Sequence, residues 1–401
     1  MPAQQSDKPV PALLENSPPS ALPEWILLHA GFVTIGLITP LIGPLLPYFI
    51  RHWSLSDSQA GLFFTAQFFG SFLGTASTSY LLPKFGSAKV LALGFLFFVI
   101  GFSFFGVGPW LVSVLAVAVY GAGYGLCNPT TNLRATQLPS SNMAGAVSLL
   151  NFSWGIGAVL CPFVAGILLP RVGLRGIAAL LITFSVIIAG FHLSRVRAAS
   201  AIKIEHRNRS LQDWLQNLRP APSVSLVLLF FLYVGCEVGI GGWVAGQEKR
   251  VAPSVASTIF LAPSFFYGFL LIGRGLVPLA LRRLSTASLS IGGLLLAATG
   301  TSLILISHHV PILCLGASFA GLGLAPQYPV VVTWLAQIYR ENADWLSALF
   351  FAAAGLGGAI LPWLIGVVSA KTNSLAAGFV VPLAAILIMV WLALRSRPST
   401  S

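Results

Sequence analysis

The sequence predicts an all-α membrane protein in which twelve transmembrane helices form two pseudo-symmetric six-helix bundles. Only 8 % of the 401 residues are charged and 56 % are hydrophobic, whereas a soluble domain carries about a quarter charged residues. The hydrophobic residues occur in runs of about 20 or more, the length that crosses the hydrocarbon core of a bilayer. Glycines and prolines also recur at one fixed spacing in the two halves of the chain. Together, these observations make a soluble helical protein untenable.

The apolar runs define the expected helices in order. In the first half they cover 24–50, 58–82, 87–107, 110–133, 143–169 and 174–193. In the second half they cover 223–246, 258–281, 285–306, 311–338, 345–369 and 375–395. Residues 1–23, rich in Pro, Ser and Ala, predict a disordered cytoplasmic tail, and 396–401 a short second tail. The polar stretch 194–222 predicts a cytoplasmic linker between the bundles 24–193 and 223–395.

The basic residues predict the orientation of this membrane protein. If both termini are cytoplasmic, 15 Lys and Arg residues lie on the cytoplasmic side and six on the outer side. This asymmetry follows the positive-inside rule and predicts a multi-pass protein of the inner (plasma) membrane with both termini in the cytoplasm. The net charge of +12 is thereby explained without nucleic acid as a partner. We expect the lipid bilayer as the surroundings and a monomer as the functional unit.

The repeat of glycines and prolines indicates an internal duplication. Each member of the first set is followed 200 residues later by an identical residue: Gly121, Gly123, Pro129, Gly155, Gly157, Pro162 and Gly166 recur as Gly321, Gly323, Pro329, Gly355, Gly357, Pro362 and Gly366. The repeat relates the fourth helix to the tenth and the fifth to the eleventh. Two such halves, packed closely through small residues, are typical of carriers that alternate access to a site near the membrane midplane.

Three stretches carry a resemblance to a known family: FLYVGCEVGIGGWV (231–244), SLLNFSWGIGAVLCP (148–162) and AAAGLGGAILPW (352–363). With the two-half organisation, the chain resembles the major facilitator superfamily, and these stretches are similar to its fucose–proton symporters, especially the bacterial glucose/mannose-like branch. The resemblance implies the major facilitator fold and a sugar as the small-molecule substrate. It also implies that the asparagine of the fifth helix, here Asn151, contributes to the substrate cavity.

The sequence departs from that family at several charged positions. In the loop between the second and third helices, Pro83 stands where the superfamily has an acidic residue, followed by Lys84 and Gly86. The fucose symporters carry acidic residues in their first and fourth helices. Here the helix 24–50 has no interior acid, and Asn128 occupies the acidic position of the fourth helix.

Glu237 is the candidate for proton coupling. It lies 15 residues into the helix 223–246, about 21 Å from the cytoplasmic end. A carboxylate at this depth costs at least about 2.5–3.5 kcal/mol on insertion scales, so it is expected to face the protein interior or a wet cavity. There it would exchange a proton or accept hydrogen bonds from sugar hydroxyls. A structural role for a protonated Glu237 is the alternative.

Arg274 is the possible charge partner of a membrane carboxylate. The competing interpretation, which the sequence favours, is that its side chain snorkels about 10 Å to the inner interface.

Neutral polar and aromatic side chains are the candidates for substrate binding. Amides both donate and accept hydrogen bonds, as sugar hydroxyls do, and an indole face packs on the apolar side of a sugar ring. The substrate-binding set, in which each member alone is more often a packing residue, is Gln67, Asn128, Asn132, Asn151, Trp154, Glu237, Trp243, Gln327 and Tyr328. Asn151 and Trp154 are three residues apart and so share one face of a helix.

Motifs of enzymes, metal sites and cofactor sites are not found in the sequence, so we expect no catalysis, no metal and no cofactor. The predicted function is secondary active transport of a small polar solute, a monosaccharide by preference, as proton-coupled import by alternating access. An exporter of amphipathic compounds or drugs is the alternative, for which 28 Phe residues would provide a greasy cavity. A non-transporting membrane sensor is a second alternative function, although the 29-residue linker offers little room for a signalling domain.

Overall fold

The computed structural model describes residues 22–138, 143–194, 220–253, 260–339 and 343–395. Within these ranges the regular secondary structure is α-helical. The first part of the chain contains α1 (Leu22–Ile38), α2 (Ile42–Trp53), α3 (Asp57–Phe104), α4 (Trp110–Gln137) and α5 (Met143–Ser194). The second part contains α7 (Pro220–Val251), α8 (Leu261–Ala280), α9 (Thr286–Ile306), α10 (Val310–Leu324), α11 (Gln327–Tyr339), α12 (Ala343–Thr372), α13 (Leu375–Gly378) and α14 (Val380–Arg395).

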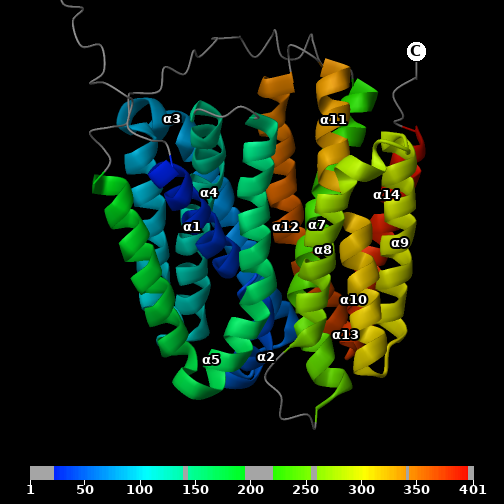
Figure 1. Ribbon diagram of the computed structural model, residues 1–401. Coiled ribbons are helices and arrows are strands. Elements are labelled where there is room, and N and C mark those ends of the chain that lie inside the picture. The colour runs from blue at the N-terminus through cyan, green and yellow to red at the C-terminus, as the bar shows by residue number, and fades with distance from the viewer. Residues whose placement is uncertain (1–21, 139–142, 195–219, 254–259, 340–342, 396–401) are drawn as a thin grey trace, which may run out of the picture.

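Ten segments of the described chain are long and apolar enough to cross a membrane. Two of them, Asp57–Phe104 and Gly145–Ser194, have 48 and 50 residues, about twice the length of one crossing. Each is interrupted at a glycine in the left-handed region, Gly86 with φ 75° and Gly173 with φ 66°. Glycine adopts this conformation without the steric penalty of a Cβ. At both points the chain turns back, so α3 and α5 each consist of two arms (Figure 1).

Two of the predicted helices are interrupted by proline. The helix expected at 24–50 is broken between α1 and α2 at Pro40, and the helix expected at 311–338 is broken between α10 and α11 at Pro326. Proline has no N–H to donate and its ring displaces the preceding turn. Continuous helices were therefore the wrong expectation at these two places. The last predicted helix, 375–395, is likewise divided near Phe379 into α13 and α14.

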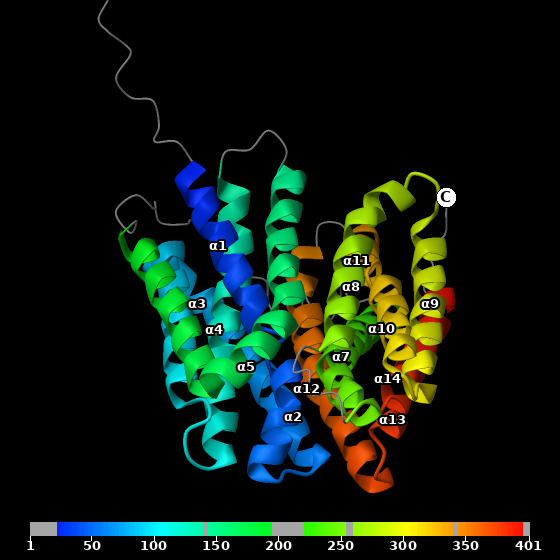
Figure 2. The ribbon, with the colours of Figure 1, turned by 60° about the horizontal axis from the view of Figure 1, so that its bottom comes forward.

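The two parts of the chain form two helical groups that lie side by side in both views (Figures 1 and 2). Helices α1–α5, blue to green, occupy one side, and α7–α14, green to red, the other. The groups meet where α3 packs on α12, α5 on α8 and α2 on α7. We call them the first half and the second half.

The repeated glycines make matching helix contacts in the two halves. A Cβ on Gly157 of α5 would overlap the carbonyl oxygen of Val33, and a Cβ on Gly357 of α12 would overlap that of Phe231. Gly121 of α4 packs in the same way on the backbone of α3, as Gly321 of α10 does on α8. Because small residues let helix backbones approach, the sequence repeat corresponds to a repeat in packing.

The outer surface of the bundle is apolar. Leu115, Phe191 and Leu387 are more than half exposed, whereas Phe63, Trp243 and other large side chains are fully buried between the helices. Exposed patches of this kind are unusual in soluble proteins and suit contact with lipid. This surface and the ten apolar segments identify an all-helical membrane protein.

Candidate functional site

Glu237 of α7 forms an ion pair with Arg274 of α8. Arg274 Nη2 lies 2.8 Å from Glu237 Oε2 and also donates a hydrogen bond to the Tyr233 hydroxyl at 2.9 Å. The Tyr233 hydroxyl in turn donates to Glu237 Oε2. Tyr233 and Glu237 are four residues apart and therefore face the same way from α7. The three side chains form a closed polar triangle, which we call the Glu237 cluster.

The ion pair corrects the favoured interpretation of Arg274. Its guanidinium does not extend to the interface but binds Glu237, with the two side chains 30 % and 14 % exposed. A charge held within a bundle is tolerated when an opposite charge and hydrogen bonds satisfy it. Arg274 Nε is nevertheless buried without a protein acceptor among the described residues, so one donor of the cluster is unused.

Arg274 also reaches the first half. Its guanidinium carbon lies 5.6 Å from the ring centroid of Trp154 on α5, within the range of a cation–π interaction. A single side chain of the second half is therefore held by Glu237 within its own half and by an indole of the other.

Trp154 belongs to a second polar group that is centred on the break between α1 and α2. Trp154 Nε1 donates to the Thr39 hydroxyl at 3.4 Å, and Gln67 Nε2 of α3 donates to the Thr39 carbonyl at 2.8 Å. Because the helix is broken at Pro40, the amide of Gly43 bonds to the Pro40 carbonyl, which leaves the Thr39 carbonyl free for Gln67. The predicted site residues Gln67 and Trp154 are thus brought together through Thr39.

The three asparagines predicted for the site form a chain of amides between α4 and α5. Asn132 Nδ2 donates to the Asn128 carbonyl at 3.0 Å, and Asn151 Nδ2 donates to Asn132 Oδ1 at 3.1 Å. Asn151 is exposed and lies one turn from Trp154 on the same face of α5. Its Nδ2 also donates to the Val147 carbonyl at 2.9 Å, so its side-chain oxygen is the group that remains available to a solute.

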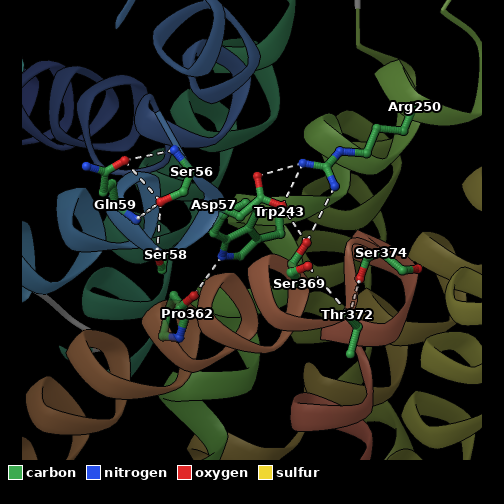
Figure 3. Close-up of polar contacts among 10 residues, drawn as sticks. All are labelled: Ser56, Asp57, Ser58, Gln59, Trp243, Arg250, Pro362, Ser369, Thr372 and Ser374. Atoms are coloured by element: carbon green, nitrogen blue, oxygen red, sulfur yellow. Dashed lines mark hydrogen bonds and ion pairs between the residues drawn. The ribbon is translucent and has the colours of Figure 1, made fainter. Parts of the chain in front are cut away.

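The other predicted site residues divide into one that joins the Glu237 cluster and two that are packed elsewhere. The Tyr328 ring lies 6.4 Å from that of Tyr233 and is 39 % exposed. Gln327 is 2 % exposed and its amide bonds Ser290 at 2.8 and 3.0 Å. Trp243 is fully buried and donates from Nε1 to the Pro362 carbonyl at 2.8 Å (Figure 3).

Sequence reasoning missed three functional or supporting residues. Tyr233 lies one turn before Glu237, a spacing that would have found it. Nothing in the sequence around Thr39 indicated a role for it, apart from the proline that follows at position 40. Glu248 was missed because α7 continues to Val251, beyond the expected end at 246. Its buried carboxylate accepts hydrogen bonds from the backbone N–H groups of Leu261 and Ala262 at 3.1 and 2.9 Å, and so it caps α8.

Comparison with known proteins now places the chain in a family. The family model described as Major Facilitator Superfamily matches residues 28–283. The chain belongs to the major facilitator superfamily. This membership makes it a secondary transporter rather than an enzyme, and the predicted family is confirmed.

The curated relatives of this superfamily member include sugar transporters. The chain is 23 % identical over 355 residues to the glucose/mannose transporter GlcP of Bacillus subtilis (strain 168), covering 85 % of this chain and 87 % of that protein. It is 22 % identical over 387 residues to the human sodium-dependent glucose transporter 1, covering 86 % and 73 % of the two chains.

Solved structures of other transporters share the fold. The nucleoside transporter NupG, solved as a point mutant, has a TM-score of 0.77 at 12 % identity, over 93 % of this chain and 99 % of that one. A D-xylose–proton symporter has a TM-score of 0.72 at 17 % identity, over 95 % and 98 %. The symporter FucP in its outward conformation has a TM-score of 0.64 at 16 % identity, over 94 % and 99 %.

Proposed function

We propose that this transporter imports a monosaccharide together with a proton, by alternating access between two six-helix halves. The breaks at Gly86 and Gly173 divide the two longest of the ten membrane segments, so the chain makes twelve crossings. Both termini then lie on one side, which the basic residues assign to the cytoplasm. The observation that carries the proposal is the Glu237 cluster, because it places a titratable group at the contact between the halves.

Coupling follows from the position of Arg274. With Glu237 ionised, the guanidinium is held by the carboxylate of its own half at 2.8 Å and lies over Trp154 of the other. Protonation of Glu237 removes the counter-ion, and the positive charge is then stabilised by Tyr233 and the indole alone. The protonation state of one half thereby changes the strength of a contact with the other half, and a proton can bias the equilibrium between two conformations.

Sugar recognition is supported by the chemistry around this cluster. The side-chain oxygen of the exposed Asn151, whose Nδ2 is already bonded to Asn132 and Val147, can accept a hydrogen bond from a sugar hydroxyl. The polar groups favour a polar solute over the amphipathic compounds of the alternative exporter. The glucose transport named for both curated relatives supports a hexose as the first substrate to test.

Uptake of labelled hexoses into proteoliposomes tests this proposal. We expect accumulation when the outside is acidic and loss of accumulation when a protonophore is added. Accumulation driven by a sodium gradient at constant pH would instead assign sodium as the coupling ion. No uptake or exchange of any hexose by a folded protein would reject the substrate class.

A further inference from the structure

A second charged cluster joins the two halves at the far end of α7 from its start at Pro220. Arg250 Nη2 of α7 lies 2.6 and 2.7 Å from the two carboxylate oxygens of Asp57, the first residue of α3 (Figure 3). The Ser369 hydroxyl of α12 donates to Asp57 and accepts from Arg250 Nη1 at 3.4 Å. Asp57 belongs to the first half and the other two residues to the second. We call them the Asp57 cluster.

Both sides of the Asp57 cluster are held in place by their own half. In the first half, Ser56 and Gln59 form a capping box that fixes the first turn of α3. In the second half, Trp243 bonds the Pro362 carbonyl and so ties α7 to α12. The ion pair therefore connects two preformed surfaces, and separation of the halves at this end requires its rupture.

The closed contact continues inward from the Asp57 cluster. Thr65, eight residues further along α3, donates from its hydroxyl to the Ala359 carbonyl of α12 at 2.8 Å. A Cβ on Gly43 of α2 would lie 3.0 Å from the Gly242 carbonyl of α7, so these helix backbones also touch. Arg250 is 13 residues from Glu237 along α7, or about 20 Å. The halves are thus in contact between the Glu237 cluster and this end of the bundle.

We infer that the Asp57–Arg250–Ser369 cluster is the outer gate of the transporter, a reversible latch that closes this face and opens whenever the solute enters from it. The inference rests on the proposed alternating access. An ion pair suits this task because the cost of dehydrating two charges offsets much of their attraction. Asp57 is 9 % exposed in the closed contact while Arg250 remains 40 % exposed, so water is at hand to hydrate both charges on opening.

The test measures access to Thr65 from each side of the membrane. Thr65→Cys provides the reporter, because the four native cysteines are buried, and a membrane-impermeant maleimide is applied to intact cells and to inverted vesicles. Adding Asp57→Asn should raise the labelling rate about fivefold, the upper limit for an ion pair that is partly exposed to water. The rise should occur on one face only, and in intact cells if the proposed orientation holds.

Three further variants make the result decisive. Asp57→Arg with Arg250→Asp restores the attraction and should return the rate to within about twofold of the parent. Ser369→Ala, the milder change if Asp57→Asn fails to fold, should raise the rate about twofold. Glu24→Gln is the matched control, since Glu24 pairs with Arg134 at 2.5 Å within the first half and should leave the rate unchanged.

Unaltered labelling in both Asp57→Asn and Ser369→Ala, or an equal rise in Glu24→Gln, overturns the gate. The labelling requires neither a solute nor a coupling ion, so a failure of proton-coupled hexose uptake would leave this result standing.

Discussion

Replacement of Glu237 by Gln tests the coupling mechanism most directly. Gln keeps the shape of the side chain and one acceptor for Tyr233 and Arg274, but it cannot exchange a proton. The hydrogen bond from Tyr233 becomes a neutral one, the bond from Arg274 keeps only its cationic donor, and Arg274 loses its counter-ion. Because Arg274 is 30 % exposed and its hydrogen bonds persist, we expect a loss of about 2 kcal/mol in stability. The variant should therefore remain folded.

The transport consequence of Glu237→Gln follows from the energy of a proton gradient. With one proton per solute, a gradient of one pH unit supports about tenfold accumulation, since each unit corresponds to about 1.4 kcal/mol. The parent should approach this ratio in proteoliposomes, and Glu237→Gln should stop at equal concentrations inside and outside. Exchange of labelled for unlabelled hexose should stay within about threefold of the parent, because exchange needs no net proton release.

Glu248→Gln provides the matched control, since it alters the other acid of α7, which is buried and caps α8. It should accumulate hexose like the parent. If Glu237→Gln also accumulates hexose like the parent, with the same dependence on pH, Glu237 carries no coupling proton and the mechanism is refuted. If its exchange vanishes as well while the protein is folded, Glu237 is a sugar ligand instead.

Three further predictions concern binding, the contact between halves and the scaffold. Asn151→Ala should weaken hexose binding by up to about tenfold, since its acceptor oxygen for a sugar hydroxyl is lost. Gln327→Ala should instead lower the melting temperature, because the Ser290 hydroxyl loses its acceptor. Binding affinity and thermal unfolding measure the two effects, and the reverse pattern would contradict the assignment. Arg274→Lys keeps the charge but removes the planar guanidinium that lies over Trp154, so the initial uptake rate should fall about tenfold. An uptake rate equal to that of the parent would show that the contact with the Trp154 indole does not affect transport. Gly157→Ala and Gly357→Ala should each destabilise the protein by about 1–3 kcal/mol. Gly190→Ala should not, because the space around Gly190 is open. Equal melting temperatures for all three variants would contradict the close approach of the helix backbones at Gly157 and Gly357.

The sequence predicted the helices well because each must satisfy its backbone within an apolar run of fixed length. It did not predict the interruptions at Pro40 and Pro326, since proline is tolerated in many membrane helices and its effect depends on the neighbours that satisfy the freed carbonyl. At Pro40 that neighbour is Gln67, from another helix. Such a partner is chosen by tertiary packing and leaves no local trace.

The sequence predicted a site residue correctly where its depth in the membrane settles its role. It did not do so where the role depends on the direction in which the side chain points from its helix. Glu237 stood out because an acid in a membrane helix requires a partner, but the choice of Arg274 over the interface required the relative rotation of α7 and α8. Asn151 and Gln327 are both amides within apolar runs, yet one is exposed and the other is 2 % exposed. Rotation of a helix about its axis, which separates these cases, is not encoded in hydropathy.

The duplicated glycine contacts bear on how such a carrier changes its cargo. Val33 contacts Gly157 in the first half, as Phe231 contacts Gly357 in the second. Thr39 lies six residues after Val33, and Glu237 lies six residues after Phe231. Positions that correspond by these glycine contacts thus hold a neutral hydroxyl in one half and an acid in the other, while the contacts beside them are alike. Selection for a new solute or ion can act on this pair of positions without redesigning the frame that moves them.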